Sequence, residues 1–440
     1  MPAPLMVIPS SPELPKECDA VVIGGGIVGA CAAWYLAKGG MRVALIEKGR
    51  VGCEQSSRNW GWCRQQNRDQ RLLPLATASL SCWEEIAEDL GEDLGFRRTG
   101  LLYVSDDEAE LANWRDWSVF GNDQGVENHM LTAKEATELA RSTGKAWKGG
   151  VSAPSDGIAD TSSAAPRIAR GLLSRGGTVH QFCAARGLET SAGKVTGVVT
   201  EAGTIRTSRV ILAGGAWSSS FCRQLGISFP QATIRSTAIS TLPGGPDIPH
   251  AFHSKGATIT RRRDGGITLA ISQLARVDPT PQSLRYARHF LPMFMARSDV
   301  LSFGDLRALF NGQESLRKWA LDRPTPMERI RTLDPRPEPG VVALILERAH
   351  RFIPELASLG VQTSWSGYID STPDGLPVID PDAGPEGLVL ATGFSGQGFG
   401  TGPGTGRLVA DIVLGQDSAI PRAGLELARL HKGRAKVARF

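Results

Sequence analysis

Residues 20–49 read AVVIGGGIVGACAAWYLAKGGMRVALIEKG. A β-branched run that ends at Ile23 is followed by three glycines, by an alanine-rich run and by a second apolar run. This order predicts a strand at 19–23, a helix at 27–39 and a strand at 41–46. Both strands are apolar almost throughout, which is typical of a parallel sheet covered by helices on both faces.

The glycines form the motif Gly24-x-Gly26-x-x-Gly29 at the predicted junction of strand and helix. Gly24 permits the tight turn, Gly26 lets the backbone approach a pyrophosphate, and Gly29 lets helix and strand pack closely. Ile27 and Val28 begin the helix, whose free N–H groups and positive dipole end favour phosphate. The motif therefore predicts that the chain binds a dinucleotide.

Glu47 ends the second strand, 18 residues after Gly29. A carboxylate at this position can accept hydrogen bonds from both ribose hydroxyls of an adenosine. It disfavours a 2′-phosphate, so FAD or NAD is preferred to NADP. The alternative interpretation is a glycine-rich turn followed by a solvated glutamate.

A second glycine-rich turn, GFSGQGFG at 393–400, follows a predicted strand at 387–392 and precedes a predicted helix at 406–414. A chain that binds only NAD has no evident need for two such turns. A chain that binds an extended FAD does, because one helix end can hold the pyrophosphate while the other directs N–H groups at the flavin pyrimidine. The alternative is a plain loop with glycine caps.

The composition excludes several classes of protein. The 440 residues carry 49 basic and 45 acidic side chains, a net charge of +4 without a basic arm, so nucleic acid is a poor candidate for a partner. Seven cysteines without a C-x-x-C pair favour a reduced, cytoplasmic protein, and the histidines show no metal-ligand spacing. Three glycines interrupt the uncharged stretch 20–37, so we expect no transmembrane segment.

Sheet-forming blocks occur at both ends and in the middle of the chain, and residues 231–290 alternate between apolar and polar side chains, as in an antiparallel sheet. We expect an α/β with α+β fold, in which a Rossmann-like FAD-binding domain is interleaved with a substrate domain built on an antiparallel sheet plus helices. The expected ranges are 15–71, 150–230 and 360–440 for the first domain, and 72–149 and 231–359 for the second.

Four blocks of the sequence resemble the D-amino-acid oxidase-like family of FAD-dependent oxidoreductases, which includes glycine oxidase and sarcosine oxidase. They are VVIGGGIVGACAAWYLA…VALIEKG (21–49), SDGIAD (155–160), RVILAGGAWSS (209–219) and WSGYIDSTPDGLPVID…GLVLATGFSGQGFG (365–400). The blocks lie in family order across nearly the whole chain. The resemblance implies an FAD domain, a substrate domain and oxidation of a carbon–nitrogen bond in an amine or amino acid.

The resemblance also implies where the cofactor binds. Lys48 would add an adenosine contact, the segment Ser56-Ser57-Arg58 would contact phosphates and flavin, and Ala185 would face the adenine. The full set of implied FAD contacts is Gly24, Gly26, Ile27, Val28, Gly29, Glu47, Lys48, Ser56, Ser57, Arg58, Ala185, Gly214, Gly215, Gly367, Gly396, Gln397, Gly398 and Phe399.

Three departures from the sarcosine oxidases bear on the chemistry. The cysteine that binds flavin covalently in those enzymes matches Gly367, so we expect non-covalent FAD. The lysine that helps to hold the substrate carboxylate matches Gly400. A lysine and a histidine that serve oxygen activation and catalysis match Thr268 and Ser272, so the expected electron acceptor is O2 or another molecule.

Two arginines are candidates for the substrate site. Gly61-Trp62-Cys63-Arg64 is similar to the sarcosine oxidase segment Gly-x-x-Arg, whose arginine binds the substrate carboxylate. Arg64 is therefore expected to anchor a carboxylate with its planar fork, the alternatives being a surface ion pair or a phosphate contact. Family members often place an arginine of the substrate-domain sheet over the flavin, and Arg262 is the candidate here, the alternative being a solvated hairpin end.

We therefore expect FAD-dependent oxidation of the Cα–N bond of a small carboxylate-bearing amine, by hydride transfer to flavin N5 followed by imine hydrolysis. A secondary amino acid is favoured, of the N-alkyl or N-carboxyalkyl glycine type that includes imino-diacids. One alternative is a D-amino-acid dehydrogenase or oxidase that acts on primary amines. Further alternatives are an NAD-dependent dehydrogenase and a flavoprotein subunit without catalytic activity.

Overall fold

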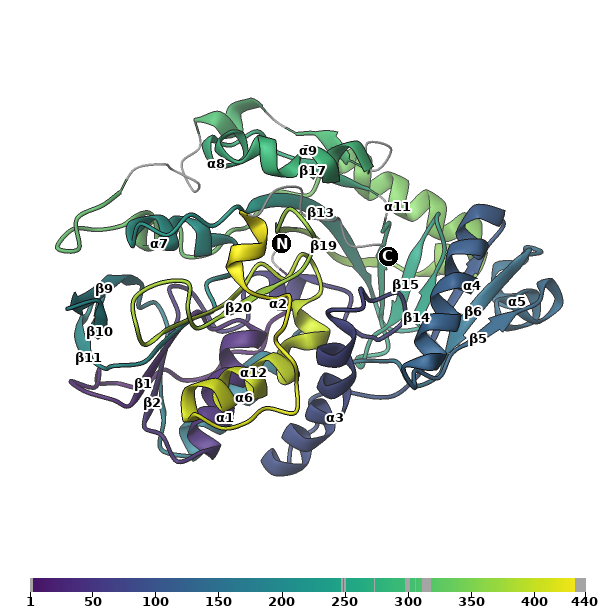
Figure 1. The fold of residues 1–440 in the computed structure, drawn as a ribbon. Helices are drawn as coiled ribbons and strands as arrows, with labels where there is room; N and C mark the ends of the chain where they lie inside the picture. The colour runs from purple at the N-terminus through teal and green to yellow at the C-terminus, as the bar shows by residue number, and fades with distance from the viewer. Residues whose placement is uncertain are drawn as a thin grey trace.

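A parallel sheet wrapped by helices and a larger, mostly antiparallel sheet form the protein (Figure 1). The α/β with α+β architecture predicted from the sequence is confirmed. The computed structural model describes residues 3–246, 248, 251–272, 274–296, 301–304, 306–310 and 318–431.

The parallel sheet has the strand order β20-β21-β12-β1-β2-β8, with β20 antiparallel at one edge. Strand β1 lies near its centre and pairs in parallel with β2 and β12. All four residues of β1 are buried, as an unbroken apolar run predicts. The six strands are β1 (Ala20–Ile23), β2 (Val43–Ile46), β8 (Thr178–His180), β12 (Val210–Leu212), β20 (Val378–Asp380) and β21 (Leu388–Thr392).

Helices pack against this sheet and against one another. Helix α1 (Ile27–Lys38) contacts both α6 (Ala164–Ser174) and α12 (Gly398–Leu414), and α12 in turn contacts α3 (Leu73–Leu90). Every residue of α1 except Lys38 is buried. Burial among other helices therefore explains the uncharged sequence that follows the first strand.

Helix α12 begins at Gly398, eight residues before the start predicted at 406. Its glycines bring it very close to its neighbours. A Cβ on Gly402 would lie 2.9 Å from the side chain of Ile27, and a Cβ on Gly406 would lie 2.5 Å from the backbone of Cys31. Because glycine is a poor helix former, sequence patterns miss these first turns, whereas the packing requires the glycines.

The larger sheet runs β18-β17-β13-β16-β15-β14-β4-β6-β5, and β19 pairs with β13. Its pairs are antiparallel except β14 with β4 and β17 with β18, which confirms the antiparallel character predicted for 231–290. The strands are β4 (Leu101–Ser105), β5 (His129–Leu131), β6 (Gly149–Ala153), β13 (Ala232–Thr241), β14 (Ala251–His253), β15 (Thr258–Arg261), β16 (Ile267–Ala270), β17 (Ala275–Val277), β18 (Leu301–Phe303) and β19 (Val361–Ser371).

Smaller elements complete the fold. Strands β3 (Trp62–Cys63) and β7 (Gly157–Ile158) pair, and β9 (Ala185–Ser191), β10 (Lys194–Thr200) and β11 (Gly203–Arg206) form a three-stranded sheet. The remaining α-helices of the described residues are α2 (Gln55–Arg58), α4 (Glu108–Asp123), α5 (Ala133–Leu139), α7 (Ser218–Gln224), α8 (Pro281–Arg285), α9 (Ala287–Ala296), α10 (Pro326–Arg329) and α11 (Pro339–Phe352).

Strands β6 and β19 bear on the predicted domain limits. The prediction assigns nearly all of β6 and all of β19 to the cofactor-binding domain, yet both strands pair within the larger sheet. Both strands begin within a residue of a predicted limit, at 150 and 360. Pairing alone does not define a domain, so the division into two interleaved domains stays a prediction.

Two further features concern the environment of the protein. Within the described residues, no helix is both long and apolar enough to pass through a bilayer. All seven cysteines are free. The cytoplasmic location expected from the cysteine pattern stays a prediction.

We predict that Gly406→Ala destabilises the protein, although alanine is the better helix former by about 1 kcal/mol. The added Cβ would meet the backbone of Cys31 at 2.5 Å, and backbone cannot move aside without shifting α1. Overpacking of this kind costs about 1–3 kcal/mol. Thermal and urea unfolding of the two proteins measures the effect.

Gly340→Ala is the matched control. Gly340 lies in the first turn of α11 with open space around its Cα. The same change there should leave stability unchanged or slightly raised. Equal stability of Gly406→Ala and the parent protein would contradict the close-packing argument.

Candidate active site

A cavity of about 920 Å³ lies between the two sheets. One wall consists of the turns that follow β1 and β12 and the end of β2, which belong to the parallel sheet. Another wall consists of residues 236–238 of β13 and 367–370 of β19, which belong to the larger sheet. Residues of both predicted domains therefore line the cavity. It lies at the carboxyl ends of parallel strands, where ligands bind in such sheets.

The first glycine motif forms a tight turn at one end of the cavity. Gly24 has φ +107° and lies against the carbonyl of Ala213, while a Cβ on Gly29 would lie 1.9 Å from the carbonyl oxygen of Gly24. These glycines let β1, α1 and the turn after β12 approach one another. Helix α1 therefore begins at the cavity wall, with the N–H of Ile27 donating to Ser56 Oγ at 2.9 Å.

Glu47 lies beside this turn and is buried. Its Oε2 accepts the N–H of Gly25 at 2.7 Å, and its Oε1 accepts the N–H of Gly49 at 2.6 Å. Burial raises the pKa of this carboxyl above its usual range. Each oxygen keeps a lone pair that can accept a further hydrogen bond, as a ribose diol would require.

The neighbouring Lys48 is held by the protein itself. Its Nζ lies 2.5 Å from Glu54 Oε1 and donates to the carbonyls of Ile330 and Arg331. Glu54 in turn accepts the N–H of Leu333 at 2.9 Å. Residues 330–333 therefore lie across the loop that follows β2, next to the predicted adenosine site.

The second glycine-rich turn also borders the cavity, next to β19. Gly393, Ser395 and Gly396 all have positive φ, at 73°, 52° and 82°. The buried Asp370 holds this turn, since its carboxylate accepts the N–H of Gly393 at 3.0 Å and its carbonyl accepts the N–H of Ser395. Burial raises the pKa of Asp370 to about 7.

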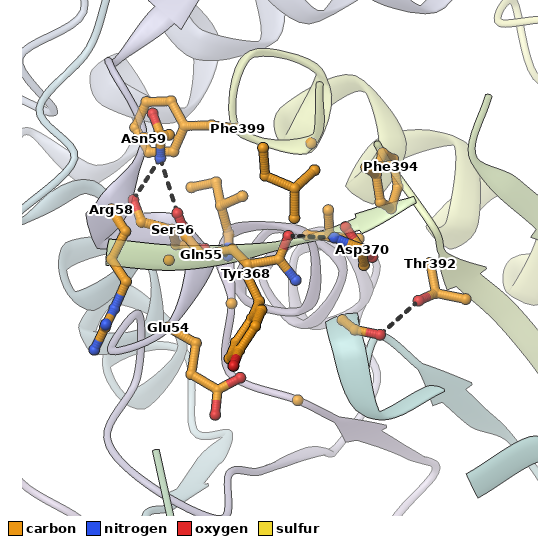
Figure 2. Close-up of a pocket in the computed structure, with 18 of the residues that line it drawn as sticks. Glu54, Gln55, Ser56, Arg58, Asn59, Tyr368, Asp370, Thr392, Phe394 and Phe399 are labelled. Atoms are coloured by element: carbon orange, nitrogen blue, oxygen red, sulfur yellow. Dashed lines mark hydrogen bonds between the residues drawn. The ribbon is translucent and has the colours of Figure 1, made fainter. Parts of the chain in front are cut away.

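Helix α2 lines the cavity and contacts both β19 and the loop after β2. Figure 2 shows Gln55 reaching toward Asp370, whose backbone N–H donates to Gln55 Oε1 at 3.3 Å. Arg58 is buried, and its Nη1 donates to Asp334 Oδ1 and to the carbonyl of Ser366, both at 2.7 Å. The segment 55–58 therefore ties the loop after β2 to strand β19.

Arg64 lies at the end of the cavity nearest the larger sheet. Its Nη1 donates to the carbonyl of Gln66 at 2.7 Å and to the hydroxyl of Tyr103 on β4 at 3.3 Å. Trp60 and Trp62 also line this end, and the ring of Trp62 packs edge-on against Tyr103. Burial raises the pKa of Tyr103, so its hydroxyl stays neutral.

A second guanidinium, that of Arg68, lines the same end and is only 4% exposed. Its Nε donates to the carbonyl of Arg64, and its Nη1 donates to Gln397 Oε1. The buried Asp156 accepts the N–H groups of Gln65 and Gln66 at 2.6 and 3.2 Å, which fixes the backbone between the two arginines. Burial raises the pKa of Asp156 to about 6.

The structure brings most of the residues predicted from the sequence into this cavity. Three do not line it: Gly29 acts in packing, Ser57 Oγ donates to the carbonyl of Glu54, and Arg262 lies elsewhere. The predicted residues that line it are Gly24, Gly26, Ile27, Val28, Glu47, Lys48, Ser56, Arg58, Arg64, Ala185, Gly214, Gly215, Gly367, Gly396, Gln397, Gly398 and Phe399.

The prediction for Arg262 needs correction. Its side chain pairs with Asp264 and donates to Gln362 Oε1, and it borders a separate pocket of about 40 Å³. Arg262 follows β15, where the chain turns back toward β16. Its side chain therefore makes its contacts at the end of this hairpin. Of the two positions matched to the sarcosine oxidase lysine and histidine, Ser272 lines the large cavity and Thr268 borders the small pocket.

Sequence reasoning missed Arg68, Asp370 and Gln55 as site residues. Arg68 lies four residues after Arg64 in a segment without clear periodicity, and only this spacing could have drawn attention to it. Asp370 lies within the quoted block 365–400 and Gln55 directly before the quoted serines. The only sequence signal for Asp370 and Gln55 is therefore that each lies in or next to a recognised motif.

Comparison with known proteins decides the family. The family model described as DAO, FAD dependent oxidoreductase, matches residues 19–412. The chain belongs to the DAO family. It is therefore an FAD-dependent oxidoreductase, as the resemblance of its motifs implies.

Several relatives are similar along nearly their whole length. Glycine oxidase of Geobacillus kaustophilus (strain HTA426) is 26% identical over 428 residues, covering 95% of this chain and 98% of that protein. Sarcosine oxidase subunit beta of an Arthrobacter species is 25% identical, covering 96% and 94%. The structure of L-amino acid deaminase from Proteus myxofaciens in complex with anthranilate is 27% identical with a TM-score of 0.92, covering 98% and 97%.

The residues present fit FAD. The cavity is of the size that holds a large ligand. A helix N-terminus and a buried carboxylate with unused lone pairs lie at one end, and the start of α12 lies at the other. When bound, FAD would accept two electrons and a hydrogen from the substrate. Glu47, the turn at Gly24–Gly29 and the segment 396–399 are the residues that would hold it.

We predict that Asp370 makes stability depend on pH. The carboxyl ionises near 3.8 in the unfolded chain and near 7 in the folded protein. Between these values the folded protein holds a proton that the unfolded chain has lost, so the free energy of unfolding falls as pH rises. Asp370→Asn should reduce this slope by up to about 1.4 kcal/mol per pH unit, measured by urea unfolding from pH 4 to pH 8.

Asp417→Asn is the control, because Asp417 is exposed and lies outside the cavity. It should leave the slope unchanged. If Asp370→Asn and the parent protein showed the same dependence on pH, the carboxyl of Asp370 would titrate as an ordinary surface group.

Proposed function

We propose that this enzyme oxidises the Cα–N bond of a small amino acid, and that its substrate is a secondary amino acid of the N-alkyl or N-carboxyalkyl glycine type. The observation that carries the proposal is a guanidinium in the cavity, that of Arg64, without a carboxylate partner among the described residues. The names of the relatives, glycine oxidase and sarcosine oxidase, support the reaction class.

Arg64 would bind the carboxylate of the substrate. Both N–H groups of its Nη1 are held by Gln66 and Tyr103, so the guanidinium plane is fixed and its Nε and Nη2 groups remain available to a ligand. A planar fork of this kind binds a carboxylate in two places and so fixes which C–H bond faces the flavin. Trp60 and Trp62 would restrict water at this end of the cavity.

Two uncharged aromatic side chains, those of Tyr103 and His253, lie beside Arg64. Burial lowers the pKa of His253 to about 3, and the phenol of Tyr103 is likewise held neutral. Their rings pack against each other with centroids 5.3 Å apart. The two rings therefore pack beside Arg64 without adding a charge.

A second candidate is the oxidation of a primary amino acid. The likeness to an L-amino acid deaminase, with a TM-score of 0.92 over nearly the whole chain, favours it. Both candidates use the same carboxylate anchor. They differ only in the group that the amine nitrogen carries.

Anaerobic reduction of the flavin tests the proposal directly. The holoprotein is mixed with N-substituted glycines and with D- and L-amino acids, and the visible flavin absorbance is followed. We expect an N-substituted glycine to bleach the flavin. Bleaching by primary amino acids alone would favour the second candidate, and a protein that no amino acid reduces would exclude both. Admission of air then shows whether O2 serves as the acceptor.

We predict that Arg64→Gln weakens binding of the substrate carboxylate by about 10- to 150-fold, because a charge-assisted hydrogen bond contributes about 1.5–3 kcal/mol. The concentration that gives half-maximal bleaching measures this affinity. Arg351→Gln, which removes an exposed arginine far from the cavity, is the control and should leave it unchanged. Unchanged affinity in Arg64→Gln would mean that Arg64 does not anchor the carboxylate.

A further inference from the structure

Two guanidinium groups line one end of the cavity, and neither has a carboxylate partner among the described residues. Arg64 donates to Gln66 and Tyr103, and Arg68 donates to Arg64 and Gln397, all of them neutral acceptors. Arg58, which lines the same cavity, is different because it pairs with Asp334 at 2.7 Å. The two arginines therefore form a cationic site inside the protein.

Each of these guanidinium groups keeps donors for a ligand. A guanidinium has five N–H groups. Arg64 uses both N–H groups of Nη1, and Arg68 uses its Nε and one N–H of Nη1. Among the described residues, no hydrogen bond occupies the other N–H groups of these two arginines, and both arginines line the cavity.

One carboxylate is not enough to balance the two charges. Asp156 interacts electrostatically with both arginines, but its two oxygens accept backbone N–H groups and it forms no salt bridge with either guanidinium. Arg68 is almost fully buried, and a buried cation without an adjacent anion is costly. A ligand that brings its own negative charge would remove this cost.

The two guanidinium groups are held from different elements. Arg64 is fixed by Tyr103 of β4, in the larger sheet, and Arg68 is fixed by Gln397, directly before α12. This arrangement suits two anionic groups on one ligand better than a single carboxylate shared by both. The two anion-binding positions would also differ in their surroundings. The one at Arg64 lies on the side of the larger sheet, and the one at Arg68 lies next to the second glycine-rich turn.

We propose that the substrate carries two anionic groups, and that Arg68 binds the second one while Arg64 binds the first. This inference rests on the proposed oxidation of an amino acid and narrows its substrate to an imino- or amino-diacid. Arg68 is then the residue that determines specificity for the second acidic group. The alternative role for Arg68, stabilising negative charge on the flavin, is an outcome of the test.

The test uses two ligands that cannot be oxidised at a carbon–nitrogen bond. Glutarate has the chain length of a diacid with an amine or imine group between its carboxylates, and butyrate lacks its second carboxylate. Binding of each to the holoprotein is measured from the change in flavin absorbance, without turnover. We expect glutarate to bind at least 10-fold more tightly than butyrate.

Substitution of Arg68 should remove this preference. In Arg68→Gln, we expect glutarate to bind no more than about 3-fold more tightly than butyrate, with butyrate affinity nearly unchanged, and Arg68→Lys should restore part of the preference. Arg64→Gln should weaken both ligands. Arg98→Gln removes a surface arginine paired with Glu84, outside the cavity, and should match the parent protein.

Two results would overturn the proposal. The first is equal binding of glutarate and butyrate to the parent protein. The second is an Arg68→Gln variant that keeps the preference but shifts the flavin midpoint potential, which would assign Arg68 to the cofactor. Failure of the proposed oxidation is a separate result, because it shows as a flavin that no amino acid reduces, whatever the outcome of the binding comparison.

Discussion

The close contact between helices α1 and α12 is the constraint on which the cofactor site depends. Gly402 and Gly406 let α12 approach Ile27 and Cys31 of α1 to distances that a side chain would prevent. Each helix begins directly after one of the two glycine-rich turns. The contact between the helices therefore sets the two turns at a fixed separation, and the cavity that they border is as rigid as the packing behind it.

The substrate end of the cavity depends on a short loop, residues 64–68, which buried polar groups hold in place. Asp156 binds the backbone next to Arg64, and Arg68 is held between the carbonyl of Arg64 and the side chain of Gln397. The loop itself has little regular structure beyond the two residues of β3. Its order comes from hydrogen bonds to elements distant in the sequence, so the geometry of the arginines depends on tertiary structure.

This difference explains what could be predicted from the sequence. The turn at Gly24–Gly29 and the position of Glu47 follow from local patterns, since strand, turn and helix each have a characteristic composition. The start of α12 was predicted too late in the chain. Glycines at the start of a helix look like a loop until the helix packed against them, here α1, is known. Arg68 and Asp370 have no sequence pattern of their own, because their roles come from Gln397 and Gly393, which lie outside their own segments of the chain. Arg262 does not line the cavity, because it pairs with Asp264 at the hairpin end, and a family resemblance does not reveal that ion pair.

The order of the strands has a consequence for how the protein is made. Strand β1 is the first of the parallel sheet to leave the ribosome, and its neighbour β12 and the next strand β21 are synthesised much later. Residues 330–333, which lie across the loop after β2, and the turn at 393–398 are also synthesised long after β1. The walls of the FAD site are thus complete only once the turn at 393–398 has been made, so a chain that stops before this turn lacks one side of the site.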